Sequence, residues 1–93
     1  MSAKKILAFF IEGCPYCRQA KKAVSELANE SQYAEIQIEW VNENQHPEIS
    51  ERYDYYYVPS FFVDDVKIYE AKRRETYEEC KENVKRVFDT ALA

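Results

Sequence analysis

The first half of the chain combines a continuous apolar run, a helical pattern and an alternating pattern. Residues 5–11 are almost all apolar, which is typical of a strand buried on both faces. Ile36, Ile38 and Trp40 alternate with polar residues, which indicates a second strand. Between them, residues 15–29 predict a helix, since apolar positions recur at helical spacing at Cys17, Ala20, Val24, Leu27 and Ala28. Because a helix connects the two strands, we expect them to run parallel.

A short helix is predicted after the second strand. Pro47 suits the first turn of a helix that ends near Tyr53, and it follows a polar loop in which Asn44 and His46 are candidate caps. We expect Ile49 and Tyr53 to face the interior.

A hairpin and a long helix complete the pattern. Residues 60–63 and 66–69 predict two antiparallel strands, because Asp64-Asp65 between them tolerates the left-handed backbone of a two-residue turn. Thr76 and Glu79 form a capping box that starts the last helix. Its apolar stripe is Tyr77, Cys80, Val84, Val87, Phe88 and Ala91.

The resulting order is β-α-β-α-β-β-α, which predicts an α/β fold. A four-stranded mixed sheet flanked by three helices, with helices on both faces, accounts for every segment. The sequence of 93 residues is expected to form a single domain, residues 1–93.

Charge and composition narrow the classes of partner. A net charge of −4 disfavours a nucleic-acid surface. The apolar run near the N-terminus is too short for a signal peptide or a membrane span, so we expect a cytoplasmic protein that does not bind membranes. In that compartment structural disulfides are rare, so a Cys-x-x-Cys pair is more often catalytic or metal-binding.

The candidate chemistry lies in Cys14-Pro15-Tyr16-Cys17, which follows Gly13. Two thiols one helical turn apart can close into a disulfide. Gly13 permits a sharp turn from strand to helix, and Pro15 suits the first helical position. The N–H groups and dipole at the helix start would stabilise a Cys14 thiolate, with Cys17 as the resolving thiol. The thiolate would also be stabilised by the positive charges of Arg18, Lys21 and Lys22, whereas the negative charge of Glu12 would slightly destabilise it.

Other interpretations of these side chains stay open. A zinc site needs about four ligands, and Cys14, Cys17, Cys80 and His46 are the candidates, but no second Cys-x-x-Cys is present, so we assign no metal ligands. The pair could instead be two buried, inert cysteines. His46 is interpreted as a cap or surface residue rather than a general base. Cys80, on the apolar stripe of the last helix, is interpreted as a buried hydrophobe rather than a third redox thiol.

With this dithiol after the first strand and Val58-Pro59 before the third, the chain resembles the glutaredoxins and small thioredoxin-like redoxins over essentially its whole length. The resemblance implies a thioredoxin fold and a thiol-disulfide oxidoreductase with Cys14 as nucleophile. It also implies that Pro59 is cis and faces Cys14, and that Val58 offers its backbone to a bound thiol substrate. Tyr16 and the tyrosines at 55–57 would border the same groove. The alternative for these tyrosines is that they pack in the interior or face solvent, and the alternative for Pro59 is an ordinary proline at the start of a strand.

The chain departs from the glutaredoxin pattern at two places. Glutaredoxins usually carry Lys or Arg three residues before the first cysteine, where this chain has Ile11. They usually carry two glycines and then acidic residues where this chain has residues 69–73, Tyr-Glu-Ala-Lys-Arg. We expect no tightly bound cofactor. The electron donor is expected to be either glutathione, as a possible co-substrate, or a protein reductase such as a flavoprotein. Lys72, Arg73 and Arg74 are interpreted as a solvated cluster, with anion binding as the alternative.

The predicted function is thus reduction of disulfides in proteins or small molecules by a monomeric redoxin. Two alternative functions are consistent with the sequence. The first is that of a non-catalytic binding module that holds a partner on its tyrosine-rich face. The second is a metal or iron–sulfur carrier, whose two thiols would need ligands from a second subunit or from glutathione.

Overall fold

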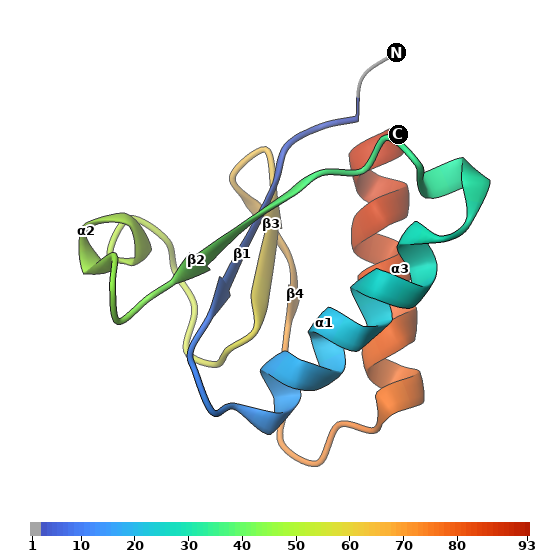
Figure 1. Ribbon diagram of the computed structural model, residues 1–93. Coiled ribbons are helices and arrows are strands. Elements are labelled where there is room, and N and C mark those ends of the chain that lie inside the picture. Colours follow the sequence, from blue (N-terminus) through green and yellow to red (C-terminus); the bar gives the residue numbers. More distant parts are fainter. Residues whose placement is uncertain (1–2) are drawn as a thin grey trace.

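The computed structural model describes residues 3–93, and its strands and helices follow the predicted order (Figure 1). The elements are β1 (Ile6–Phe10), α1 (Pro15–Ala28), a 3-10 turn η1 (Ser31–Tyr33), β2 (Ile38–Asn42), α2 (Pro47–Ser50), β3 (Ser60–Val63), β4 (Val66–Glu70) and α3 (Tyr77–Leu92).

The four strands form one mixed sheet in the order β2-β1-β3-β4. β1 pairs parallel with β2 and antiparallel with β3, and β3 pairs antiparallel with β4. The predicted parallel unit and the predicted hairpin are therefore both confirmed. Asp64 and Asp65 have φ values of 49° and 68°, the two positive angles that a tight hairpin turn of this kind requires.

Side chains of β1 alternate between two hydrophobic cores, which explains why this strand is apolar throughout. Ile6 and Ala8 contribute to the core between the sheet and the helices α1 and α3, which lie side by side in Figure 1. Leu7 and Phe9 contribute to a smaller core on the opposite face. There α2 supplies Ile49, so helices cover both faces of the sheet, as predicted.

Tyrosines supply much of the smaller core. Tyr53 and Tyr55 pack against Phe9, with ring centroids 5.2 and 4.8 Å from it. Both tyrosines also contact Phe62, and their hydroxyls hydrogen-bond to Asp65 and Glu43. The inward orientation of Ile49 and Tyr53 is confirmed, and Tyr55 has a packing role.

Some local predictions were wrong. The second strand begins at Ile38 rather than near Ile36, and α2 ends at Ser50, after which turns continue to Tyr53. His46 occupies the N-cap position of α2 and is exposed, in agreement with its interpretation as a cap or surface residue, but its side chain makes no capping hydrogen bond and its Nδ1 lies 3.2 Å from Glu48. The turn before α2 is closed by Asn42, whose side chain accepts the Asn44 N–H.

The buried face of α1 is rotated relative to the predicted stripe. Ala23 is fully buried, whereas Ala28 is exposed and Val24 is half-buried. The core-facing positions are Cys17, Ala20, Ala23 and Leu27. Small residues at 20 and 23 let α1 approach the sheet and α3 closely.

The capping box at the start of α3 yields a test of the fold. Thr76 accepts the N–H of Glu79, and Glu79 in turn accepts the N–H of Thr76. Thr76→Ala should lower the free energy of unfolding by about 0.5–2 kcal/mol, because an orphan N–H loses its acceptor. Thr76→Ser retains the hydroxyl and should remain close to wild type in urea titrations. Equal stability of all three proteins would contradict a stabilising cap.

Candidate active site around Cys14 and Cys17

The turn between β1 and α1 places Cys14 at the start of a helix. Gly13 has a φ of 74°, a left-handed conformation that favours glycine. Cys14 follows as the N-cap with extended backbone, and its Sγ accepts the Cys17 N–H at 3.2 Å. Pro15 is the first helical residue, and it has no N–H to leave unpaired. A cysteine sulfur here takes the place of the usual capping oxygen.

The two thiols of the pair differ in environment. Cys14 is partly exposed, whereas Cys17 is only 3% exposed. Burial is the main cause that raises the pKa of Cys17, to about 12, and the neighbouring Cys14 thiol adds to it. Both cysteines are free thiols in this structure. Cys17 is therefore protonated and shielded, and Cys14 is the thiol that a reactant can reach.

The segment before β3 faces the Cys14 sulfur. The Val58–Pro59 peptide bond is cis, as the resemblance to the redoxins implies. The Cys14 thiol donates to the Val58 carbonyl oxygen at 3.8 Å, although 44 positions separate the two residues. Pro59 is buried and Val58 is half-buried. The structure thus brings together the predicted site residues Cys14, Cys17, Val58 and Pro59.

Tyr16 connects the dithiol turn to the loop between β4 and α3. Its hydroxyl accepts the Arg74 N–H at 2.8 Å. Arg74 has a φ of 63°, which is uncommon for a residue with a side chain, and its N–H is held in place by this hydrogen bond. Tyr16 therefore has a structural contact that the sequence did not predict, since 58 positions separate the partners.

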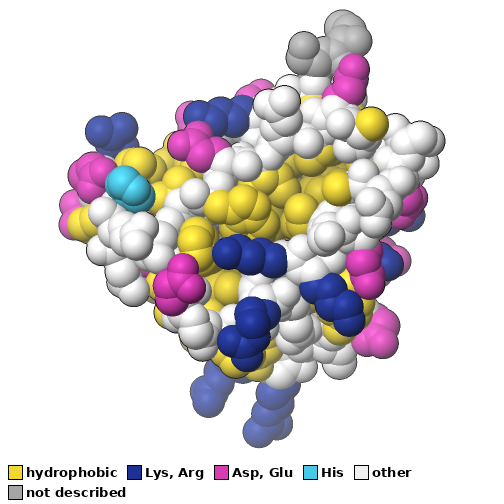
Figure 2. Space-filling view, in the orientation of Figure 1, with side chains coloured by type: hydrophobic (Ala, Val, Ile, Leu, Met, Phe, Trp, Pro, Cys, Tyr) yellow, Lys and Arg dark blue, Asp and Glu magenta, His cyan; other side chains and the backbone are white. Residues whose placement is uncertain are grey.

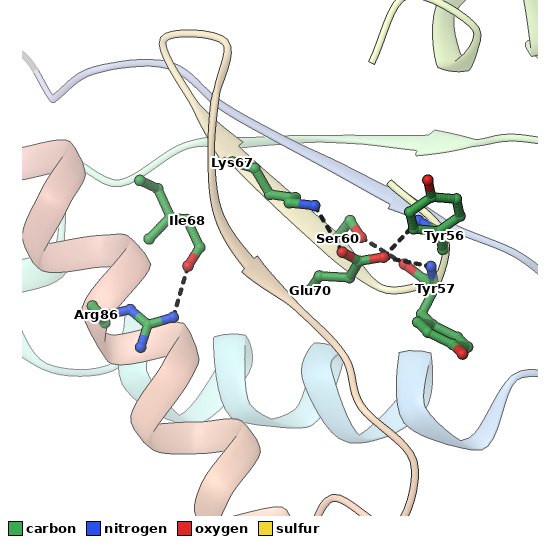
Figure 3. A network of polar contacts seen from close by, with 7 residues as sticks. All are labelled: Tyr56, Tyr57, Ser60, Lys67, Ile68, Glu70 and Arg86. Carbon is green, nitrogen blue, oxygen red and sulfur yellow. Dashed lines mark hydrogen bonds and ion pairs between the residues drawn. The ribbon is translucent and has the colours of Figure 1, made fainter. Parts of the chain in front are cut away.

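Glu70 fixes the two exposed tyrosines that precede Val58 (Figure 3). Its Oε2 accepts the N–H groups of Tyr56 and Tyr57 at 2.5 and 2.7 Å, and its Oε1 pairs with Lys67 at 2.8 Å. Burial tends to raise the pKa of the Glu70 carboxyl, but the Lys67 ion pair and the two N–H groups outweigh it, and the pKa is lowered. Ser60 donates to the Tyr57 carbonyl at 2.5 Å.

The tyrosines at 55–57, which were expected to line one groove, differ in their environments. Tyr56 and Tyr57 are 86% and 54% exposed and lie directly before Val58, so they are available to a partner. Tyr55 is instead part of the smaller core.

The remaining candidate side chains lie outside this arrangement. Cys80 lies on the buried face of α3, as predicted, and burial raises the pKa of its thiol. His46 is exposed at the start of α2. Within residues 3–93 no three His, Cys, Asp or Glu side chains converge on a position that could hold a metal ion. In the same range no helix has the length and apolar character needed to span a bilayer.

Comparison with known proteins places this arrangement in a family. Residues 4–85 match the family model described as a thioredoxin domain. The chain belongs to the thioredoxin domain family. It is 34% identical over 76 residues to a thioredoxin of Methanocaldococcus jannaschii, an alignment that covers 81% of this chain and 88% of that protein.

Solved structures agree on the fold. Thioredoxin 1 from Thermosipho africanus superposes with a TM-score of 0.60 at 18% identity, covering 96% of this chain and 99% of that one. A malarial protein superposes with a TM-score of 0.66 at 12% identity, covering 99% and 100%. The order β2-β1-β3-β4 with its three helices is a thioredoxin fold.

The different environments of the two thiols predict different reactivities in this thioredoxin-family chain. At about pH 8, iodoacetamide should modify Cys14 first and leave Cys17 largely intact, because a buried neutral thiol is a poor nucleophile. The raised pKa keeps Cys17 protonated at this pH. Urea should abolish this protection. Time-resolved alkylation with peptide mass mapping measures both rates, and equal rates in the folded protein would refute the distinction.

The Glu70 contacts predict a local effect on the segment before Val58. Glu70→Ala leaves two N–H groups without their acceptor and should cost about 1–3 kcal/mol of unfolding free energy. Hydrogen exchange should accelerate at the Tyr56 and Tyr57 amides. Lys67→Met is the matched control, since it removes only a partly exposed ion pair worth about 0–1 kcal/mol. Unchanged exchange at both amides in Glu70→Ala would contradict the assigned role.

Proposed function

We propose that this protein is a thiol-disulfide oxidoreductase that reduces disulfides by dithiol exchange through Cys14 and Cys17. The observation that carries the proposal is the pair of thiols at the start of α1, one reachable and one shielded, with the Val58 carbonyl beside the reachable sulfur. Membership of the thioredoxin domain family supports the same chemistry.

In the first step, the Cys14 thiolate attacks one sulfur of the substrate disulfide. A new sulfur–sulfur bond forms between Cys14 and the substrate, and the other substrate sulfur departs as a thiolate. The Cys17 N–H, 3.2 Å from the Cys14 sulfur, is positioned to stabilise negative charge there. The backbone of Val58, a half-buried residue whose carbonyl lies beside the Cys14 sulfur, would align the substrate chain.

In the second step, Cys17 resolves the mixed disulfide. It gives its proton to the departed substrate thiolate and attacks the Cys14 sulfur, which releases the second substrate thiolate. Two electrons thus pass from the dithiol to the substrate, and a Cys14–Cys17 disulfide remains. The burial of Cys17 keeps it neutral until the mixed disulfide brings an electrophilic sulfur within its reach.

The electron donor that restores the dithiol is proposed to be a protein reductase, such as a flavoprotein, with glutathione as a possible co-substrate. Two features favour the reductase. Ile11 stands where glutaredoxins usually carry a cation. Glu70 already accepts the N–H groups of Tyr56 and Tyr57 and pairs with Lys67, so its charge is not available to a glutathione amine.

One observation favours the binding-module alternative. Tyr56 and Tyr57 present two exposed aromatic rings beside the site, and exposed aromatic residues are common in protein interfaces. In that case partner binding would persist without the thiols. Comparing Cys14→Ser with wild type for partner capture and for disulfide reduction separates the two functions.

Substitution of each cysteine tests the proposed mechanism. Cys14→Ser should lose reduction of a model protein disulfide, by about three orders of magnitude or more, because it removes the attacking sulfur. Cys17→Ser should instead accumulate a covalent complex through Cys14 that dithiothreitol releases. Cys80→Ala is the matched control, since Cys80 is a buried core thiol that the mechanism does not use, and it should retain activity. Reduction by Cys14→Ser at the wild-type rate would exclude the mechanism.

A further inference from the structure

Positive charge gathers around the dithiol although the chain carries a net charge of −4. Figure 2 shows dark blue side chains over the lower end of the molecule, where α1 begins in Figure 1. Arg18, on the first turn of α1, and Arg73 and Arg74, on the β4–α3 loop, are all exposed. We call these three arginines the basic rim.

The basic rim is held beside the site by backbone contacts. The Arg18 N–H donates to the Cys14 carbonyl at 3.1 Å, so Arg18 lies one turn from the reactive sulfur. The Arg74 N–H donates to the Tyr16 hydroxyl at 2.8 Å, which places the β4–α3 loop against the dithiol turn. The left-handed backbone of Arg74 is thus fixed within this contact.

The nearby carboxylates are mostly occupied by other groups. Glu75 is buried and accepts from Tyr69 and Asn83, and Glu79 pairs with Lys72 at 3.2 Å. Glu70 holds the backbone before Val58. Exposed Glu12 is the acidic residue closest in sequence to Cys14.

Consequently, within residues 3–93 no carboxylate forms an ion pair with Arg18, Arg73 or Arg74. Guanidinium groups recognise carboxylates in bidentate geometry, and unpaired surface charge directs association with molecules of opposite sign. The other exposed cations nearby have partners: Lys72 pairs with Glu79, whereas Lys21 lies over the Phe10 ring and Lys22 over the Tyr77 ring.

We infer that the basic rim selects substrates whose disulfide is flanked by acidic residues. The inference rests on the proposed function, because it names the substrate class of the same site. An acidic polypeptide segment on either side of the target cysteines would approach Arg18, Arg73 and Arg74 while its disulfide approaches Cys14. The partner is therefore an acidic protein segment rather than a small neutral disulfide.

Single-turnover reduction of matched peptides tests this inference. Pre-reduced protein is mixed with one of two cyclic disulfide peptides that differ only in having Glu or Gln beside the cysteines. An exposed ion pair is worth about 0.2–1 kcal/mol, or about 1.4- to 5-fold. With several arginines we expect the Glu peptide to react about 5- to 20-fold faster at low salt. The ratio should fall toward one at about 0.5 M salt, where screening is strong.

Variants that remove positive charge test whether the preference for the Glu peptide comes from the basic rim. Arg73→Gln with Arg74→Gln should reduce the ratio to about 1- to 3-fold without changing the rate for the Gln peptide. The control is the double variant Arg52→Gln with Lys85→Gln, which also removes two positive charges. Arg52 lies in the turn after α2 and Lys85 on α3, and both are exposed. This variant should keep the wild-type ratio of the two peptide rates.

The outcomes separate the inference from the function on which it rests. Equal rates for the two peptides with wild-type protein, or an equal loss of the ratio in the control variant, would overturn the acidic selectivity and leave the oxidoreductase intact. Failure to reduce either peptide would overturn the proposed function itself.

Discussion

The left-handed turn at Gly13 is the constraint on which the site depends. It ends β1, redirects the chain and leaves Cys14 as the N-cap of α1, so that a sulfur takes the Cys17 N–H. The turn is held from both sides, because β1 is buried between two cores and α1 packs its small residues against the sheet and α3. A rigid scaffold therefore presents one thiol at the surface and keeps the other beneath it.

Local chemistry explains why the scaffold could be predicted from sequence. The apolar run of β1, the Thr76 capping box and the Asp64-Asp65 turn each depend on neighbouring residues, and each forms as expected. The errors arose where tertiary packing decides between equivalent positions. Ala23 and Ala28 both suit a helical stripe, but only Ala23 faces the core. His46 stands at the N-cap of α2, yet its ring pairs with Glu48.

The contacts that hold the rim of the site were not predictable from sequence patterns. Tyr16 meets Arg74 and Glu70 meets Tyr56 through hydrogen bonds between residues far apart in the chain, and no periodicity marks such partners. The weak signal available was that Glu70 lies within residues 69–73, where the chain departs from the glutaredoxin pattern, and that Arg74 directly follows them. In the structure the Glu70 carboxylate supports the segment before Val58, and the Arg74 backbone N–H contacts the dithiol turn at Tyr16.

The reduction potential of the Cys14–Cys17 pair tests the central claim most directly. The protein is equilibrated in glutathione buffers of graded ratio, and free thiols are counted by alkylation and mass. A redox dithiol predicts one two-electron transition with a midpoint between about −270 and −200 mV, the range of thioredoxins and glutaredoxins. Cysteines that stay reduced at every ratio, or that form only separate adducts with glutathione, would contradict the account.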